Sequence, residues 1–295
     1  MKKSFVKLTK KTLSILPHAT PAKIYNVLIK IPILKQMANS LIKSAIPDYL
    51  ETSEWKLILD KDDVAMSGYL ALGSYEPETI KHFKDSLKEG ATAVDIGTNI
   101  GYYTIIAGKK IGPRGKVFAY EPNKDSFSLL KQNIEINNFC NVTPLNIALS
   151  DSSGERVLYF GDNKCTHSFA DNRKTGKNQV VTTDTLDNSL KKYGSPRVDV
   201  IKMDIEGAEI LALEGMTETI ERSPGLIIFT EFYPKAIKRL GKSPIKFLER
   251  FRELNFSIFI ISEDKKGLIP LKDFEDFVSN FPDDESFRNL YAIKK

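Results

Sequence analysis

Cysteine and histidine are scarce in this sequence of 295 residues. The two cysteines, Cys140 and Cys165, lie outside any CxxC or Cys/His spacing that would hold zinc, and two thiols are too few for a disulfide framework. The three histidines, His18, His82 and His167, are scattered, so each is interpreted as a surface or core residue rather than a catalytic one. This usage excludes a zinc site and a disulfide-rich secreted domain, and it favours a reducing cytoplasm.

The sequence also lacks a long hydrophobic run. No stretch approaches the roughly 18 apolar residues of a membrane-spanning helix, and Pro17, His18 and Lys23 interrupt the early stretch in which a signal peptide would lie. Hydrophobic residues make up 41% and charged residues 27% of the chain, which is the composition of an ordinary globular protein. We therefore expect a cytoplasmic protein that is neither inserted into a membrane nor secreted.

Positive charge is concentrated at the start of the chain. Residues 1–50 contain nine lysines and one aspartate, whereas the remainder has a slight excess of acidic residues. Apolar residues recur there at helical spacing with lysines between them, which predicts a basic amphipathic helical extension interrupted at Pro32. Two interpretations stay open. The first, which we favour, is an arm that packs on the protein itself or on a second subunit; the second is a segment that lies on an anionic membrane surface, which would place the protein peripherally at the inner membrane.

From residue 91 onwards, short apolar runs alternate with helical patterns, as in a parallel sheet covered by helices. The sequence therefore predicts an α/β, Rossmann-like fold, with a catalytic domain over residues 91–295, a lead-in over 51–90 and the extension over 1–50. The expected strands cover residues 91–96, 116–120, 142–149, 198–203, 226–230, 256–261 and 290–293. Residues 150–183 are expected to be irregular with one hairpin strand at 156–160, and they form either part of a substrate wall or a plain connecting loop.

A glycine-bearing turn follows the first expected strand. Asp95 stands near the end of that strand, and Gly97 and Gly101 flank Asn99. Glycine lets the backbone turn sharply and approach a ligand closely, and asparagine tolerates the left-handed conformation better than most residues do. Open α/β sheets bind their ligands outside the carboxyl ends of the strands, so this loop is expected to cradle a nucleoside.

A carboxylate, Glu121, stands at the end of the second expected strand, where it can accept hydrogen bonds from both hydroxyls of a ribose. The dinucleotide fingerprint GxGxxG, placed on Gly97, would require glycines at Asn99 and Tyr102, and both are absent. Asp95, two residues before the first glycine, instead fits the pattern of proteins that bind S-adenosylmethionine (SAM), which also lacks the pyrophosphate that the dinucleotide loop holds. The sequence thus favours SAM over NAD.

Several segments occur in an order that is specific to one family. In chain order they are GSYE (73–76), VDIGTNIG (94–101), VFAYEPN (117–123), Asn133 with Asn137, ALSD (148–151), TLD (185–187) and KMDIEGAE (202–209). From about Gly68 to Phe232 the chain resembles the FkbM family of SAM-dependent methyltransferases. The resemblance implies a class I methyltransferase fold, with a seven-stranded, mostly parallel sheet that ends in an antiparallel hairpin. It also implies O-methylation of a hydroxyl on a sugar, glycan or other metabolite, and it leaves the acceptor open.

The same resemblance implies which residues bind SAM. They are Asp95, Gly97, Asn99, Gly101, Glu121 and the region of Ala148, in agreement with the positions inferred from the strand ends. Tyr75 and Glu76 would close over the methionine end of SAM, with helix capping as the alternative for Glu76.

Lys202, Asp204 and Glu206 follow the fourth expected strand, where this fold commonly places groups that face the transferred methyl. The two carboxylates are expected to orient or deprotonate the acceptor hydroxyl, and Asp204 is favoured because Glu206 is expected to open the next helix, at its positive N-terminus. Lys202 would either bind the acceptor oxygen or hold the two carboxylates apart. The alternative is a charged network that caps the helix. A metal bridging the carboxylates would lack a histidine or third acid nearby, so no metal site is expected.

Two functions from other classes compete with methyl transfer. One is a nucleotide-binding oxidoreductase, and the other is a catalytically silent, membrane-associated assembly factor that keeps the fold and uses the basic arm. Nucleic acid is disfavoured as a substrate, because the catalytic part is slightly acidic and has no interleaved aromatic and basic stripe. The expected partner is therefore a small-molecule or glycan hydroxyl acceptor, with an anionic membrane or a second copy of the chain as the alternatives for residues 1–50.

Overall fold

The computed structural model describes residues 40, 42–161, 166–171 and 175–295. Most of the predicted basic extension and Cys165 lie outside these residues. The chain forms two compact units, one with residues up to 50 and 58–75 and the other with residues 51–57 and 76–295. The boundary after residue 75 falls inside the expected lead-in segment 51–90, and the predicted division into domains stays a prediction.

The first unit contains helix α4 (Met66–Leu72), which ends at Gly73. Gly73 adopts the left-handed conformation with a φ of 68°, and its N–H donates to the carbonyl of Leu70, as at many helix C-termini. Strands β1 (Tyr49–Glu51) and β2 (Lys56–Ile58) form a two-stranded sheet. Gly73, the first residue of the GSYE segment, thus ends α4.

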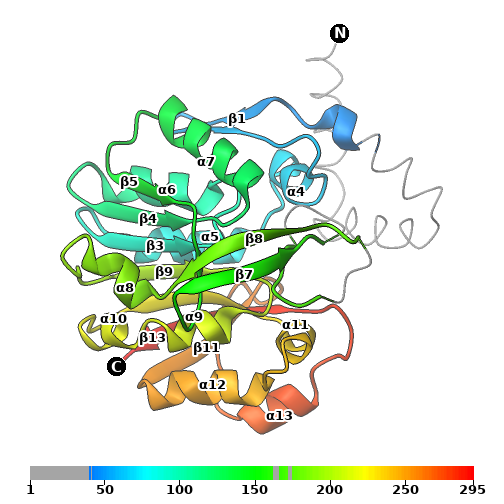
Figure 1. The fold of residues 1–295 in the computed structure, drawn as a ribbon, viewed down its shortest axis with the longest axis vertical. Coiled ribbons are helices and arrows are strands. Elements are labelled where there is room, and N and C mark those ends of the chain that lie inside the picture. The colour runs from blue at the N-terminus through cyan, green and yellow to red at the C-terminus, as the bar shows by residue number, and fades with distance from the viewer. Residues whose placement is uncertain (1–39, 41, 162–165, 172–174) are drawn as a thin grey trace. The chain divides into compact units, whose positions relative to one another are not determined.

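The second unit is built on an eight-stranded sheet with the order β12-β11-β13-β10-β9-β3-β4-β5 (Figure 1). Neighbouring strands from β10 to β5 are parallel, whereas β13 runs antiparallel to both β10 and β11. The strands are β3 (Thr92–Ile96), β4 (Lys116–Tyr120), β5 (Val142–Leu145), β9 (Val200–Met203), β10 (Ile227–Phe232), β11 (Phe256–Ser262), β12 (Gly267–Pro270) and β13 (Arg288–Lys294). The order of the strands reverses between β3 and β9, which is where open α/β sheets bind their ligands.

Helices flank this sheet (Figure 1). They are α5 (Pro77–Ser86), α6 (Tyr102–Ile111), α7 (Lys124–Ile136), α8 (Leu186–Lys191), α9 (Glu209–Glu214), α10 (Thr217–Glu221), α11 (Pro234–Arg239), α12 (Pro244–Glu253) and α13 (Phe274–Ser279). Successive residues of β10 pack on opposite faces: the Phe229 ring meets Phe83 of α5 edge-on, with 5.5 Å between centroids, whereas Ile228 packs in the cluster that includes α9 and α12. No helix of the described part of the chain is long and apolar enough to cross a membrane.

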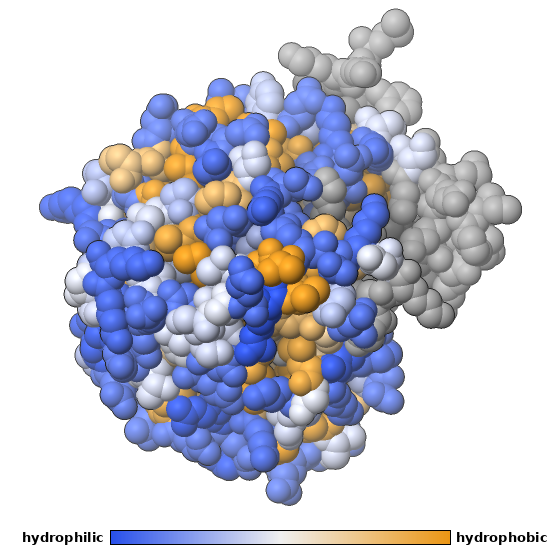
Figure 2. Space-filling model, in the orientation of Figure 1, coloured by the Kyte–Doolittle hydropathy of each residue, from blue (hydrophilic) through white to orange (hydrophobic). Residues whose placement is uncertain are grey.

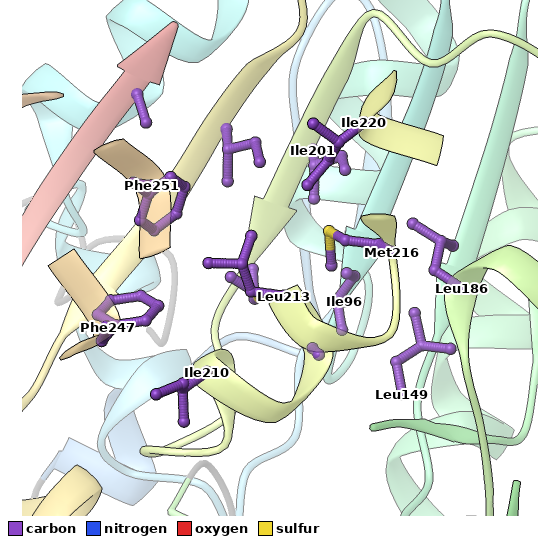
Figure 3. Packing of buried hydrophobic residues seen from close by; sticks show 14 of the residues in the cluster. Ile96, Leu149, Leu186, Ile201, Ile210, Leu213, Met216, Ile220, Phe247 and Phe251 are labelled. Carbon is purple, nitrogen blue, oxygen red and sulfur yellow. The ribbon is translucent and has the colours of Figure 1, made fainter. Parts of the chain in front are cut away.

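The main hydrophobic core lies between the sheet and helices α9, α10 and α12 (Figure 3). Ile96 and Ile201 from the strands, Leu213 and Phe251 from the helices, and Met216 from the turn between α9 and α10 are fully buried in it. Near-continuous burial along a strand is typical of parallel sheets that are covered on both faces. This packing fixes the carboxyl ends of β3, β4, β9 and β10 along one edge, where the polar residues of the site follow.

The predicted class I arrangement is confirmed, because five parallel strands are followed by an antiparallel β11 and β13 pair. Two details differ from the expectation. β12 adds an eighth strand at the edge, and the single strand expected over 142–149 is two strands that belong to different sheets. The break falls at Asn146, whose side chain donates to the carbonyls of Glu121 and Pro122 and so turns the chain away from β5.

The region expected to be irregular, 150–183, contributes two strands to a second sheet, and the hairpin strand expected at 156–160 is confirmed as β7. Strands β6 (Ala148–Leu149), β7 (Gly154–Tyr159) and β8 (Asn178–Asp184) pair in the order β6-β8-β7, and β7 and β8 form an antiparallel hairpin. Leu158 and Val181 point inwards into a small hydrophobic cluster with Ala148. Val157 and Val180 face each other on the outer side and are exposed, and Figure 2 shows hydrophobic residues gathered where the hairpin lies in Figure 1.

Candidate active site

The loop after β3 adopts the conformation predicted from its glycines and Asn99. Gly97, Asn99 and Gly101 have φ values of 77°, 51° and 92°. At Gly97 a side chain is also excluded by space, because a Cβ atom would lie 2.0 Å from the backbone oxygen of Asp204. The loop after β3 therefore packs directly on the loop after β9, and only glycine permits that approach.

Glu121 follows β4 and connects two loops. Its Oε2 accepts from the N–H of Asn99 at 2.8 Å, and its Oε1 accepts from the N–H of Asn123 at 2.8 Å. The side chain is 6% exposed, and burial raises the pKa of Glu121 to about 7 although both N–H groups oppose the shift. The carboxyl group thus sits at the position predicted for a ribose-binding residue, with each oxygen already oriented by a backbone donor.

Asp95 lies near this loop but faces helix α6. Its Oδ2 accepts a hydrogen bond from the hydroxyl of Thr104 at 2.6 Å, and the Thr104 hydroxyl lies 2.9 Å from that of Thr98. Burial raises the pKa of Asp95 to about 6, and the bond from Thr104 and the charge of Lys202 oppose the shift. This geometry gives Asp95 a role in holding the loop against the helix.

A pocket opens at the carboxyl ends of β3, β4 and β9. Its lining includes six of the residues predicted from the sequence, namely Gly97, Asn99, Glu121, Ala148, Asp204 and Glu206. Five predicted residues are not part of that lining: Glu76, Asp95, Gly101 and Lys202, together with Tyr75, which belongs to the first unit. The pocket thus brings the loops after three strands together, as the argument from strand ends predicts.

Other residues of the lining were missed. They are Pro122, Ser126, Ile147, Leu158, His167, Ser168, Phe169 and Ile205, together with core residues of the strands. His167 lies on the pocket lining, where its ring stacks on Phe160 with centroids 4.5 Å apart, and its interpretation as a surface or core residue without a catalytic role stays a prediction. The signal was available in the sequence, since Phe160 and Phe169 are bulky aromatic residues in an otherwise polar stretch.

The hairpin region is joined to the loop after β9. Ser168 pairs with Tyr159 through two backbone hydrogen bonds of 2.8 and 3.0 Å, and the Ser168 hydroxyl donates to the carbonyl of Glu206 at 3.0 Å. This contact places Ser168 beside the pocket, and the two interpretations of residues 150–183, a substrate wall or a connecting loop, both stay open.

Lys202 and Asp204 form a buried ion pair at the end of β9. The ammonium lies 3.1 Å from Oδ2 of Asp204 and 5.0 Å from the centroid of the Tyr103 ring, and Lys202 is 1% exposed. Burial alone would lower the pKa of Lys202, but the charges of Asp204, Glu76 and Glu231 outweigh it and hold that pKa above its ordinary value. The buried ammonium contacts Asp204, and the role of Lys202 toward an acceptor oxygen stays a prediction.

Glu206 does not open the next helix, in contrast to the expectation. α9 begins at Glu209, whose Oε1 accepts from the N–H of Ile205 at 2.9 Å, so Glu209 stands at the helix N-terminus where Glu206 was expected. Glu206 instead stands in the preceding loop with a φ of 56° and lines the pocket. Burial raises the pKa of Glu209 to about 7.

Glu76 stands at the N-cap position of α5 but makes no side-chain capping bond, so that alternative is not observed. Its Oε2 accepts from the Tyr103 hydroxyl at 2.5 Å, and its Oε1 accepts from Nδ2 of Asn289 at 2.8 Å. Glu76 therefore belongs to a polar network that includes Lys202 and lies beside the pocket. Within the described residues no group of three or more His, Cys, Asp or Glu side chains is arranged to hold a metal ion.

Residues 95–258 match the model of the methyltransferase FkbM domain. The hexuronic acid methyltransferase AglP of Haloferax volcanii is 30% identical over 146 residues, which are 50% of this chain and 58% of AglP. Methyltransferase sdnD of Sordaria araneosa is 29% identical over 156 residues, 42% of this chain and 60% of that protein. The chain therefore spans about three fifths of the length of these relatives. A solved SAM-dependent O-methyltransferase of Thermotoga maritima resembles the chain with a TM-score of 0.42 and 14% identity, covering 83% of this chain and 77% of that one.

Proposed function

Because the chain belongs to the FkbM methyltransferase family, we propose that it transfers the methyl group of SAM to a hydroxyl oxygen of a sugar, glycan or other small metabolite. The observation that carries the proposal is the buried carboxyl group of Glu121, which follows β4 and accepts a hydrogen bond from the N–H of Asn99. Both residues line the same pocket as Asp204. The proposed catalytic domain is residues 91–295.

The pocket residues fit SAM by their chemistry. Glu121 can accept from the two ribose hydroxyls, and Ile147, Ala148 and Leu158 offer an apolar wall for a purine ring. The described lining holds three carboxylates, Glu121, Asp204 and Glu206, and neither lysine nor arginine. A lining of that charge suits a sulfonium cation and repels a pyrophosphate, so it favours SAM over a dinucleotide and speaks against the oxidoreductase alternative.

On the acceptor side, Asp204 is the proposed general base. SAM supplies a methyl group activated by its sulfonium, so the chain's own residues mainly hold the acceptor oxygen in line and exclude water. Asp204 accepts the hydrogen bond of the acceptor hydroxyl and takes up its proton as the new bond to oxygen forms. The ion pair with Lys202 orients the Asp204 carboxylate, and Glu206 contributes a second carboxylate to the pocket lining.

The acceptor class is proposed from two kinds of support. The relative named as a hexuronic acid methyltransferase supports a sugar hydroxyl, and the hairpin that lines the pocket brings aromatic Phe169 and His167 to a position where a sugar ring could pack. For residues 1–50 the proposal from sequence is unchanged: a basic arm that packs on the protein or a second copy, with an anionic membrane surface as the alternative.

The proposal is tested by a screen of sugars, sugar acids and other hydroxyl compounds in which the release of S-adenosylhomocysteine (SAH) is measured. With any acceptor found, Asp204→Asn should lower turnover at least ~100-fold while SAM affinity changes little, because the shape stays and the base is lost. Asp264→Asn, the same substitution in an exposed turn, is the control. Equal losses of SAM binding and turnover would place Asp204 in the cofactor site, and a protein that binds NAD but not SAM would overturn the proposal.

A further inference from the structure

A second carboxyl group lies beside Asp204, on the neighbouring strand. Met203 of β9 is in register with Thr230 of β10, so the residues that follow them, Asp204 and Glu231, stand side by side at the same edge of the sheet. Neighbouring strands lie about 4.8 Å apart, and in-register residues of parallel strands point to the same face. Glu231 in turn is in register with Asn289 of β13. The row Asp204, Glu231, Asn289 therefore crosses the end of the sheet.

The ends of this row are fixed by hydrogen bonds. Asp204 is bound by the ammonium of Lys202 at 3.1 Å. The side-chain nitrogen of Asn289 donates to Glu76 at 2.8 Å and lies 3.1 Å from the hydroxyl of Thr79. The middle of the row is different, because no hydrogen bond from any described residue reaches the carboxyl oxygens of Glu231, which is 7% exposed.

The carboxyl oxygens of Glu231 are not among the fully buried polar atoms without a partner, so they keep an opening to the surface through which a ligand can reach them. Glu209 differs, because it is fully buried and its Oε1 accepts a hydrogen bond from the N–H of Ile205, while its Oε2 has no partner among the described residues and no access to the surface. The groups that face Glu231 are the carboxylates of Asp204, Glu206 and Glu209 and the ammonium of Lys202, and that ammonium is already bound to Asp204.

This environment favours the neutral form of Glu231. Burial raises its pKa well above the ordinary value, and the charges of Asp204, Glu206 and Glu209 raise it further, while the charge of Lys202 opposes the shift. A neutral carboxyl group can donate a hydrogen bond as well as accept one, whereas an ionised one only accepts.

We propose that Glu231 is a second acceptor-binding residue, which as a neutral carboxyl group donates a hydrogen bond to the oxygen next to the one that Asp204 holds. The inference rests on the proposed function and deepens it, because two adjacent carboxyl groups in different protonation states match two adjacent oxygens of one acceptor. The acceptor class that fits is a vicinal diol, as on a sugar ring, of which Asp204 deprotonates one hydroxyl and Glu231 holds the other.

The experiment compares each methylated acceptor with its analogue that lacks the hydroxyl adjacent to the methylated one. Wild-type protein should prefer the diol, and Glu231→Leu should lower kcat/KM on the diol about 10- to 100-fold but on the deoxy analogue less than about threefold. Glu231→Gln should stay within about fivefold of wild type, since an amide can also donate. Glu209→Gln, a buried carboxyl group with its own backbone partner, is the matched control and should leave the preference unchanged.

Two results would overturn the inference: an undiminished preference for the diol in Glu231→Leu, or a Glu231→Gln protein as poor as Glu231→Leu, which would mean that an ionised carboxylate is needed. An infrared difference spectrum of wild-type protein against Glu231→Gln needs no acceptor and should show the carbonyl band of a protonated carboxyl group near neutral pH. Absence of that band also overturns the inference. A protein that turns over no acceptor but shows the band would refute the proposed function and leave the neutral Glu231 supported.

Discussion

Glu121 makes the affinity for the cofactor depend on pH in a direction that the structure determines. Burial raises the pKa of the free carboxyl group to about 7, and in the proposed complex the ionised form accepts hydrogen bonds from two ribose hydroxyls. Binding therefore selects the ionised form. As pH falls below 7, an increasing share of the free protein carries a proton on Glu121 that must leave before SAM or SAH binds.

The magnitude follows from the pKa. Two pH units below a pKa of about 7, only about one molecule in a hundred has Glu121 ionised, so Kd for SAH should rise roughly 100-fold between pH 8 and pH 5, or about 2.7 kcal/mol. The reverse sign, tighter binding at low pH, has no source in this site. Asp95, with a pKa raised to about 6, also titrates in this range, but it lies outside the pocket lining and is unchanged in a Glu121 variant.

The assay is calorimetric titration with SAH from pH 5 to pH 8, on wild-type protein and on Glu121→Gln. The variant should bind more weakly at pH 8, by roughly 1–3 kcal/mol, because a charged acceptor is lost. Its affinity should also depend much less on pH. At pH 6, wild-type protein should release close to one proton for each SAH bound, measured in two buffers of different ionisation enthalpy. Parallel pH profiles for the two proteins would refute the assignment of the ribose to Glu121.

Two further predictions concern the elements that hold the pocket. Gly97→Ala should destabilise the protein by roughly 3 kcal/mol or more and abolish SAH binding, because the new Cβ meets the backbone of Asp204. Gly194→Ala, at a similar φ of 79° with open space around it, should cost only about 1 kcal/mol, and equal melting temperatures for the two variants would contradict the steric argument. The raised pKa of Glu209 means that its neutral form stabilises the folded wild-type protein at low pH and that this stabilisation is lost as Glu209 ionises. Glu209→Gln should therefore gain stability relative to wild type as pH rises from about 4.5 to 7, by up to about 3 kcal/mol. Thermal unfolding of the two proteins that shows no such trend would rule this out.

The cofactor half of the site could be predicted because its signals are local in sequence. Gly97 and Asn99 follow a strand within a few residues and Glu121 ends the next strand, so the rule that ligands bind at strand ends is enough to bring them together. The left-handed conformations of the loop follow from residue type alone. The strands of the central sheet could also be predicted locally, because they occur in the sequence as short apolar runs.

The acceptor half depends on contacts that sequence spacing does not reveal. Glu231 and Asn289 meet only through the register of β10 with β13, and neither has a motif around it. The assignment of the helix N-terminus to Glu206 rather than Glu209 failed because both are acidic and helix boundaries are uncertain by a few residues from sequence alone. Within residues 150–183 the strand predicted at 156–160 is found as β7, but its partner β8 was missed because this stretch contains many polar residues.

The central claim is that SAM binds at the carboxyl ends of β3 and β4 with its reactive end directed towards Asp204. A crystal structure of the protein with SAH tests it most directly. We expect both ribose hydroxyls within hydrogen-bonding distance of Glu121, the adenine against Ile147 and Ala148, and the sulfur nearer to Asp204 than to Glu121. SAH bound at another edge of the sheet, or in this pocket with its ribose away from Glu121, would contradict the account.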